Sequence, residues 1–406
     1  MKKYFKLILI CLLFGIRITY VDALEFDITS DYVILYNLND DEVLYEQNSE
    51  EQTQIASLTK IMATIIGIEN NANLDEEVTI TKESLQGISE YTKVGFKVGD
   101  KATVRDLLYG TMLPSGADAV NSLAIHTSGS IDNFVNLMND KVEELGLKNT
   151  KFDNPIGMDS TDNYSTASDM ASILMYALEN TDFKNIFNSR EYTISSIDKT
   201  IKSTLIGYSK SYGLDVTEIN GAKSGFTDGA GLCLASTATI DDVNYLLVTI
   251  GAETKNRSNA IRDSLEIYDY YSSNYSYQTV MEKGSILKSL PIKWGKVDSY
   301  DIKSLDEVEL YLENGIRKNK IKYEYKGIEE LNYKIKKGDK LGTITILYRD
   351  TELLTYDVYL DEYLEYYHPI LYGVIALCLI IMIISLRCIL RRKKRKIKSK
   401  KLKIKK

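Results

Sequence analysis

The chain has 406 residues, of which 44% are hydrophobic and 26% are charged, a composition that is ordinary for a globular protein. Its formal net charge of −7 hides an asymmetry, because residues 24–386 carry 33 basic and 56 acidic side chains and 13 basic residues lie from Arg387 onward. The resulting charge of −23 over residues 24–386 argues against nucleic acid as a partner of that part.

The N-terminus has the pattern of a secretory signal peptide, which we assign to residues 1–23. Three lysines among the first six residues precede the apolar run 7–16, and Val21 and Ala23 occupy the −3 and −1 positions of a cleavage site. The apolar run is too short to span a bilayer. We therefore expect cleavage after Ala23 and export of the rest; an uncleaved N-terminal anchor is the alternative.

Residues 24–274 show strand and helix patterns in an order that predicts an α+β fold. Two strands around the polar turn 37–41 form a hairpin, and a helix with a broad apolar face begins at Ser57. Mostly helical sequence follows from Thr103 to residue 188. Further strands are expected at residues 222–227, 232–238 and 243–250, before another helix. Because tight turns join the strands, the sheet should be mostly antiparallel and flanked by helices.

Residues 275–362 have the short alternating segments of a separate small all-β domain. Its clearest strands are expected at residues 308–312, 321–325, 341–347 and 353–360, with glycines between them. We expect this domain to stand between residues 24–274 and the membrane.

Residues 370–390 form a candidate transmembrane helix. The uncharged apolar part, residues 370–386, would give about 26 Å of helix. The basic tail 391–406 follows it and, by the positive-inside rule, should stay in the cytoplasm, so that the folded domains face outward. The residues expected at the membrane interface are Tyr363, Tyr366, Tyr367 and His368.

Cysteine usage predicts no disulfide within the exported domains. Cys11 falls in the signal segment, and Cys378 and Cys388 lie in or beside the C-terminal apolar run. Cys233 is then the single cysteine of residues 24–362, so no intrachain bridge can form there.

The first motif with chemical meaning is Ser57-Leu58-Thr59-Lys60, an S-x-x-K at the start of a predicted helix. Residues three apart share a helix face, so the Ser57 hydroxyl and the Lys60 amine can meet. The free backbone amides of the first helical turn favour negative charge near the serine. Lys60 can act as a base only if burial or a neighbouring cation lowers its pKa.

Two further motifs follow along the chain. Ser115 lies in Pro114-Ser115-Gly116-Ala117, a loop that opens a helix, where a serine can also be a simple N-cap. Lys223-Ser224-Gly225 lies on a predicted strand, where the glycine lets a ligand approach the strand edge and the lysine supplies a cation for a carboxylate. Each motif is weak alone, but their order and spacing match the signature set of penicillin-binding proteins and class A β-lactamases.

On these residues the chain resembles the low-molecular-mass penicillin-binding proteins, the D-alanyl-D-alanine carboxypeptidases of serine peptidase family S11. The likeness extends to Asn154-Pro155-Ile156-Gly157 and covers roughly residues 26–275, and more loosely the β-rich part behind them. It implies a penicillin-binding-protein/β-lactamase-like α+β catalytic domain, then a small all-β domain and a C-terminal transmembrane helix. The implied activity is removal of the terminal D-Ala from peptidoglycan pentapeptide stems, without cofactor or metal.

The resemblance also implies roles for single residues. Ser57 would be the nucleophile that forms an acyl-enzyme, Lys60 would take its proton, and Ser115 would relay a proton to the leaving D-Ala. The backbone amides of Ser57 and Phe226 would form the oxyanion hole. The residues expected to bind substrate are Lys223, Ser224, Gly225, Phe226, Thr227 and Arg257, with Lys223 and Ser224 on the terminal carboxylate and Arg262 as the alternative to Arg257.

Two positions depart from the family pattern. The family usually has S-x-N, whereas this chain has Ser115-Gly116-Ala117, so the amide that would orient Lys60 and the substrate carbonyl is absent. This departure makes a catalytically impaired wall-binding protein an alternative, and a D,D-transpeptidase acting through the same acyl-enzyme is another. Ser224 replaces the usual threonine but keeps the hydroxyl, which we expect to be nearly neutral.

Other hydrolase chemistries fit the sequence less well. A Ser-His-Asp enzyme would have to use His126, because His368 abuts the membrane, and no G-x-S-x-G elbow accompanies it. A zinc peptidase would need clustered histidine, cysteine or acidic ligands. A β-lactamase would need a deacylating glutamate after the second motif, and Glu143 and Glu144 are helical in pattern.

The expected partners are peptidoglycan stem peptides, β-lactams as inhibitors, and the membrane through the C-terminal helix, with no nucleic acid. We expect a single-pass membrane protein whose catalytic domain is extracytoplasmic and whose tail is cytoplasmic, acting in peptidoglycan biosynthesis and cell shape.

Overall fold

The computed structural model describes residues 26–367 and 369–403. The predicted signal peptide, residues 1–23, lies outside the described residues. The chain divides into two compact units, one from Tyr20 to Asn274 and the other containing the residues from Tyr275 onward. Each unit is described by itself.

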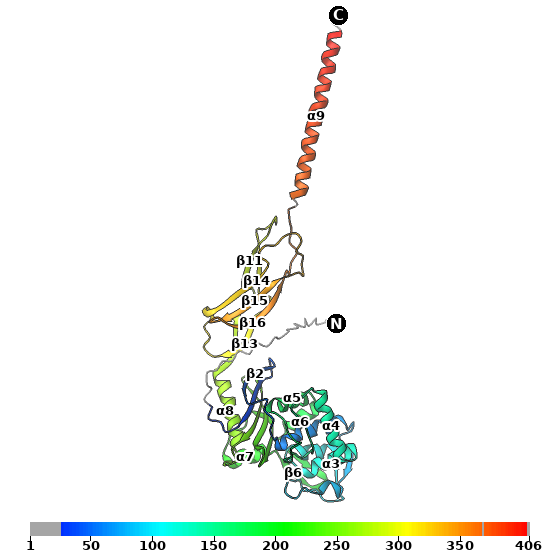
Figure 1. The fold of residues 1–406 in the computed structure, drawn as a ribbon, viewed down its shortest axis with the longest axis vertical. Helices are drawn as coiled ribbons and strands as arrows, with labels where there is room; N and C mark the ends of the chain where they lie inside the picture. Colours follow the sequence, from blue (N-terminus) through cyan, green and yellow to red (C-terminus); the bar gives the residue numbers. More distant parts are fainter. Residues whose placement is uncertain (1–25, 368, 404–406) are drawn as a thin grey trace. The chain divides into compact units, whose positions relative to one another are not determined.

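A five-stranded antiparallel sheet forms the centre of the first unit (Figure 1). Its strands, in the order β2-β1-β9-β8-β7, are β2 (Glu42–Gln47), β1 (Tyr32–Asn37), β9 (Val243–Ala252), β8 (Gly231–Ile240) and β7 (Ile219–Thr227). The N-terminal strand β1 therefore pairs with β9, which comes from the C-terminal part of the unit. Within the described residues β7 has one neighbouring strand, so it forms an edge of the sheet.

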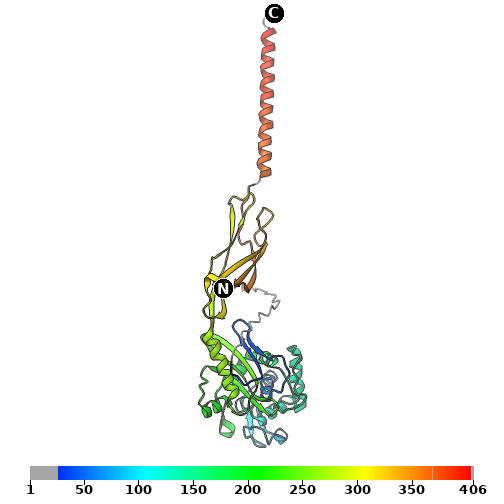
Figure 2. The same ribbon diagram turned by 60° about the vertical axis from the view of Figure 1, so that its left-hand side comes forward.

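Helices cover both faces of this sheet. On one face lies α8 (Asn259–Asn274), where the Tyr268 hydroxyl is 3.0 Å from Oγ of Ser236 on β8. The neighbouring β8 residues Cys233 and Ala235 belong to the core on the other face, as the alternation of a strand requires. Both views show α8 and the helical cluster on opposite sides of the sheet (Figure 1, Figure 2). The remaining helices are α1 (Thr59–Glu69), α2 (Val104–Met112), α3 (Ala117–Ser128), α4 (Ile131–Glu144), α5 (Ala167–Leu178), α6 (Thr181–Phe187) and α7 (Thr204–Tyr212).

Helix α1 runs through the middle of the helical core. Its residues from Thr59 to Ile68 are all buried, because the apolar side chains Ile61, Met62, Ile65 and Ile66 cover most of its surface. Gly67 permits close packing against α3, since a Cβ placed there would lie 2.7 Å from the Leu123 Cδ2 atom. A helix surrounded on all sides also buries the polar residue of its first turn, Lys60.

Several short elements were not predicted from the sequence. Two hairpins have strands of only three or four residues, too short to show alternation. They are formed by β3 (Glu77–Thr79) with β4 (Lys101–Thr103) and by β5 (Glu191–Ile194) with β6 (Lys199–Lys202). The single-turn 3₁₀ helices are η1 (Ala56–Leu58), η2 (Glu83–Leu85), η3 (Ser195–Ile197) and, in the second unit, η4 (Lys318–Lys320).

The second unit begins with a small all-β domain built from antiparallel pairs. Its strands are β10 (Tyr275–Met281), β11 (Ile286–Pro291), β12 (Ser299–Lys303), β13 (Val308–Glu313), β14 (Ile321–Gly327), β15 (Lys340–Tyr348) and β16 (Thr351–Tyr359). β10 pairs with β13, β11 with β12, and β14, β15 and β16 form one sheet. The predicted fold class, an α+β domain followed by a small all-β domain, is confirmed.

The last element, α9 (Pro369–Lys403), contains the apolar segment predicted from the sequence. Among the described residues, α9 is the one helix that is long and apolar enough to cross a membrane. The candidate span is Ile370–Ile397. Of the aromatic residues before it, Tyr363 and Tyr367 are exposed, whereas Tyr366 packs against the core of the β domain. His368 lies outside the described residues.

Candidate active site

Ser57 and Lys60 meet at the start of α1. The Lys60 Nζ atom lies 3.1 Å from the Ser57 Oγ atom, within hydrogen-bond distance. Ser57 belongs to η1, the single turn that precedes α1. Ser57 is partly exposed, whereas Lys60 is only 1% exposed. The serine is therefore accessible to a ligand and the amine behind it is shielded from water.

Burial gives Lys60 the property of a base. Desolvation penalises the charged form and lowers the pKa of Lys60 to about 7. A substantial fraction of the amine is then neutral near pH 7 and can accept a proton from the serine hydroxyl. The amine also donates a hydrogen bond to the backbone oxygen of Ile156, which holds it in place.

The loop that carries Ile156 is shaped by Asn154. The Asn154 side-chain oxygen accepts hydrogen bonds from the backbone amides of Gly157, at 2.7 Å, and Met158, at 2.9 Å. Gly157 has a φ of +85°, and a Cβ there would lie 2.0 Å from the backbone oxygen of Ala56. Glycine is thus required for this loop to pack against η1 and present the Ile156 carbonyl to Lys60.

The edge strand β7 passes directly beside the serine. A Cβ placed on Gly225 would lie 3.0 Å from the backbone nitrogen of Ser57, so any larger residue would push the strand away from η1. This proximity brings the Lys223-Ser224-Gly225 motif beside Ser57.

Lys223 is the second buried lysine of the site. Its side chain is 0% exposed, and its ammonium donates a 2.7 Å hydrogen bond to the backbone oxygen of Ser224. Burial lowers the pKa of Lys223 well below the usual lysine value, and the positive charge of Lys60 lowers it further. Because β7 passes beside η1, which leads into α1, the two buried lysines lie on neighbouring elements.

The site lacks a negative counter-charge of its own. Within residues 26–367 and 369–403, neither Lys60 nor Lys223 has a carboxylate within 4.0 Å, although buried charges in proteins are normally paired. A ligand carboxylate would supply the missing charge and favour the ammonium form of Lys223. The electrostatics therefore suit an anionic ligand.

Ser115 lies in the loop between α2 and α3, in a backbone conformation that is unusual for serine. Its φ is +62°, and its Oγ atom is buried without a hydrogen-bond partner in the described structure. An unsatisfied buried hydroxyl in a strained residue is typical of a functional position. No direct hydrogen bond joins Ser115 to Ser57 or Lys60 among the described residues.

Thr204, at the start of α7, links the Ser115 loop to β7. Its backbone amide donates to the carbonyl of Leu113 at 3.1 Å, and its Oγ1 atom lies 2.7 Å from Oγ of Ser224. Thr204 was not predicted from the sequence, because no motif or periodicity marks the helix that carries it. This contact orients the Ser224 hydroxyl at the edge of the site.

Asp118 is a second residue that the sequence analysis did not single out. Its buried carboxylate accepts hydrogen bonds from the backbone amides of Val94 at 2.8 Å, Gly95 at 2.7 Å and Phe96 at 3.0 Å. It thereby fastens an extended segment to the start of α3. The neighbouring Ala117 is fully buried and has no polar group to offer Lys60.

The two candidate arginines occupy different surroundings. The Arg257 guanidinium stacks on the Phe226 ring, 3.8 Å from its centroid, which places Arg257 beside the K-S-G strand. Arg262 Nε instead donates to Oγ of Ser258 at 3.0 Å. Thr227 Oγ1 accepts a 3.1 Å hydrogen bond from the Ala230 amide and so shapes the turn after β7.

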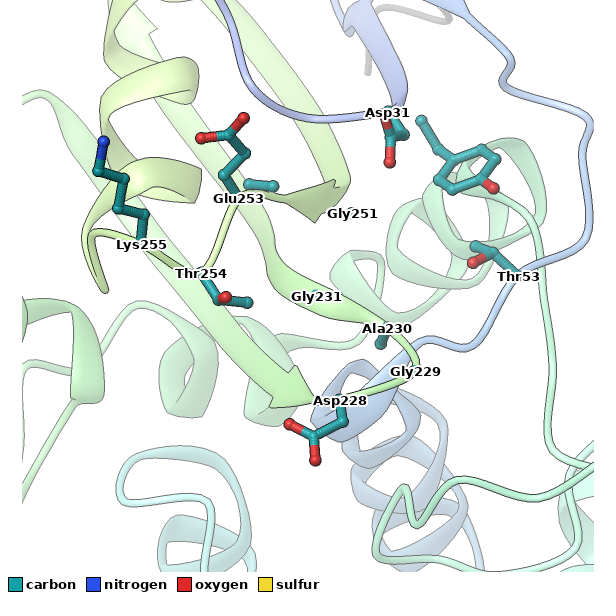
Figure 3. Close-up of a pocket in the computed structure, with 12 residues that line it drawn as sticks. Asp31, Thr53, Asp228, Gly229, Ala230, Gly231, Gly251, Glu253, Thr254 and Lys255 are labelled. Carbon is teal, nitrogen blue, oxygen red and sulfur yellow. The ribbon is translucent and has the colours of Figure 1, made fainter.

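A hollow of about 480 Å³ borders the same turn (Figure 3). It is lined by Asp228, Gly229 and Ala230 of the turn and, across from them, by Asp31 and Glu253 among others. Neither Ser57, Lys60, Ser115 nor Lys223 lines it. Because none of these four residues lines it, the hollow is distinct from the site around Ser57. Within the described residues no group of three or more His, Cys, Asp or Glu residues could hold a metal ion.

Two family models match the chain, one on each unit. That of the D-alanyl-D-alanine carboxypeptidases, peptidase family S11, matches residues 19–254. That of the C-terminal domain of penicillin-binding protein 5 matches residues 275–366.

Similar proteins of known activity cover most of the chain. The D-alanyl-D-alanine carboxypeptidase DacF of Bacillus subtilis is 29% identical over 298 residues, which are 72% of this chain and 74% of that protein. The D-alanyl-D-alanine carboxypeptidase DacA of Escherichia coli is 30% identical over 307 residues, 73% of this chain and 74% of that protein.

Solved structures show the same fold. The carboxypeptidase DacD of Francisella tularensis superimposes with a TM-score of 0.67 at 21% identity and covers 84% of this chain and 95% of its own. The Streptomyces K15 DD-transpeptidase superimposes with a TM-score of 0.55 at 29% identity and covers 60% of this chain and 97% of its own.

Proposed function

The chain belongs to the D-alanyl-D-alanine carboxypeptidases of peptidase family S11, penicillin-binding proteins that act through a serine acyl-enzyme, and from this membership we propose which of its residues carry the reaction. The observation that carries the proposal is the contact between Ser57 and Lys60, 3.1 Å long, with the amine buried. This contact pairs a nucleophile with a base whose pKa of about 7 suits proton transfer at neutral pH.

The substrate we propose is the pentapeptide stem of peptidoglycan. Its terminal carboxylate binds Lys223 and the Ser224 hydroxyl, since neither Lys60 nor Lys223 has a carboxylate partner among the described residues. Arg257, stacked on Phe226, assists at the rim. The peptide lies along the edge strand β7, which Gly225 allows to pass close to Ser57.

The acylation step follows from these positions. The Ser57 Oγ attacks the carbonyl carbon of the penultimate D-Ala while its proton passes to the neutral Lys60 amine. The backbone amides of Ser57 and Phe226 stabilise the developing oxyanion. The peptide C–N bond then breaks, and Ser115 relays a proton to the departing amino group of D-Ala.

Water completes the turnover by hydrolysing the Ser57 ester and releasing the shortened stem. A β-lactam opens by the same attack on its amide, but its leaving group stays covalently attached, so the ester persists. Transfer of the acyl group to an acceptor amine would make the protein a transpeptidase, which is the second candidate and draws support from the likeness to the Streptomyces enzyme.

A labelling experiment on the full chain tests the assignment of the nucleophile. We expect a fluorescent penicillin to label the wild type and not Ser57→Ala, while Ser211→Ala, an exposed serine of α7, labels normally. Retained labelling of Ser57→Ala would show that another serine is acylated. Release of D-Ala from a pentapeptide, with and without an added acceptor amine, separates hydrolysis from transfer.

We also propose that α9 spans the membrane with the basic tail in the cytoplasm. Residues Ile370–Ile397 would form about 42 Å of helix, which is enough to cross a bilayer. Protease added outside intact cells should remove the folded domains and leave the tail protected; digestion of the tail under the same conditions would reverse this topology.

A further inference from the structure

One loop of the β domain is bound to the segment that leads into α9. The loop 292–297 connects β11 to β12. The Tyr367 amide donates a 2.7 Å hydrogen bond to the Trp294 oxygen, and the Lys296 amide donates a 2.9 Å hydrogen bond to the Glu365 oxygen. Since α9 begins at Pro369, two residues after Tyr367, no more than about 7 Å of chain separates this contact from the helix.

The loop is held firmly at its base. The Ile292 amide donates to the Asp298 oxygen at 2.9 Å, and the Lys293 amide donates to the Leu331 oxygen at 2.8 Å. The Ile292 side chain is buried in the core of the β domain. Trp294 has a φ of +60°, which is uncommon for a bulky residue and costs free energy unless the surroundings hold it. The fold therefore fixes Trp294 at the tip of a tight turn.

Two apolar side chains of this loop are exposed. Trp294 is 56% exposed and Val297 is 57% exposed, although an indole and an isopropyl group are both stabilised by leaving water. Tyr363 and Tyr367, on the segment before α9, are exposed as well. Tryptophan and tyrosine concentrate at the boundary between water and lipid, because each combines an apolar ring with a polar group.

We propose that the Trp294 loop, together with Tyr363 and Tyr367, lies in the headgroup region of the bilayer that α9 enters. The β domain would then have a second contact with the membrane beside its covalent link to the helix. This inference rests on the proposed insertion of α9 and is independent of the catalytic proposal. The two lysines of the loop face acidic partners, Lys293 with Glu330 and Lys296 with Glu365, so we attribute the contact to burial of apolar surface and not to headgroup charge.

The chain offers a direct test, because Trp294 is its single tryptophan. The full chain is reconstituted in phosphatidylcholine vesicles whose acyl chains carry bromine close to the headgroup, a short-range quencher of indole fluorescence. We expect the vesicle-bound Trp294 to emit at a shorter wavelength than Trp294 in a chain that lacks α9 and is dissolved in detergent-free buffer. In brominated vesicles, we expect most of the Trp294 emission intensity to be lost. High salt and anionic lipid should change neither result.

A matched variant, Trp294→Phe combined with Leu305→Trp, moves the reporter within the same domain. Leu305 is also exposed, at 66%. It follows the end of β12 where Lys303 pairs with Ile286. The Trp294 loop adjoins the opposite end of β12, where Ser299 pairs with Pro291. The two ends of the five-residue strand β12 are roughly 13 Å apart. We expect this variant to emit as a water-exposed indole and to resist quenching.

Four results would overturn the inference. If the wild-type protein floats with the vesicles but its fluorescence is not quenched, the loop does not contact the lipid. If the protein does not float at all, the insertion of α9 is contradicted as well. Equal quenching of the Leu305→Trp variant would mean that the loop is not the point of contact. Quenching that disappears at high salt would mean that charge, not the aromatic cluster, holds the domain on the lipid.

Discussion

Two lysines of the catalytic unit and two of the β domain have opposite surroundings. In the catalytic unit, Lys60 and Lys223 are buried, have no carboxylate within 4.0 Å among the described residues, and have lowered pKa values. In the β domain, Lys296 and Lys322 are exposed and pair with Glu365 and Asp350, and these partners raise their pKa values.

The difference shows how one residue type becomes either a base or a surface cation. Burial without a partner removes the hydration that stabilises the ammonium, so the neutral amine becomes accessible at physiological pH. An exposed ion pair keeps the charge but contributes little to stability, because water and salt screen it. A buried, unpaired lysine reduces stability, and proteins keep such residues mainly at functional sites.

After loss of the nucleophile itself, the largest effect should come from removing Lys60, the proposed base. We expect Lys60→Ala to slow acylation by a fluorescent penicillin by roughly 10²- to 10⁴-fold, the usual contribution of a general base. Lys60→Arg should be equally slow, because guanidinium keeps its proton. Lys210→Ala, an exposed lysine of α7, is the matched control and should react at the wild-type rate. Rescue by arginine would show that the site needs a positive charge and not a base.

The pH dependence of acylation should be the next largest effect. The reactive form of Lys60 is the neutral amine, so its fraction falls as the pH drops below the pKa of about 7. The acylation rate should therefore decline about tenfold per pH unit below pH 7 and level off above it. Stopped-flow measurements from pH 5 to pH 9 would check this, and a rate that falls as the pH rises through 7 would contradict the assignment of Lys60 as the base.

A smaller effect is expected at Ala117, where the family usually has asparagine. We expect Ala117→Asn to leave turnover unchanged or raise it by up to about tenfold, since an added amide can orient Lys60 or the substrate carbonyl. D-Ala release measures the change. Because Ala117 is fully buried, the melting temperature must be recorded alongside to detect overpacking. A clear fall in turnover at an unchanged melting temperature would mean that the Ile156 carbonyl already orients Lys60 and that the amide disturbs it.

The smallest effect belongs to the surface pairs of the β domain. Lys322→Ala removes the partner of Asp350, 2.7 Å away, and should leave both the melting temperature and the acylation rate unchanged within error. Lys340→Ala, which removes the partner of Asp357, should behave in the same way. A fall of several degrees for either variant would indicate that the pair belongs to a larger charge network.

Much of the fold could be predicted because its patterns are local in the chain. The strands at 308–312 and 321–325 alternate over enough residues to be recognised, and they appear as β13 and β14 with boundaries within two residues. The apolar run of α9 is equally local. In contrast, α7 has no clear pattern, so Thr204 and its contact with Ser224 could not be foreseen.

The sequence by itself determined the order of the three motifs, the position of Ser57 and Lys60 one turn apart, and the apolar segment followed by basic residues. Only the tertiary structure decided that Lys60 and Lys223 are buried in one site, that Asp118 holds the segment at Val94, and that Trp294 lies against the chain entering α9. Periodicity and spacing are properties of neighbouring residues. Desolvation and hydrogen bonding depend on segments that are far apart in the chain, here about 70 residues for Trp294 and Tyr367, and these meet only when the protein packs.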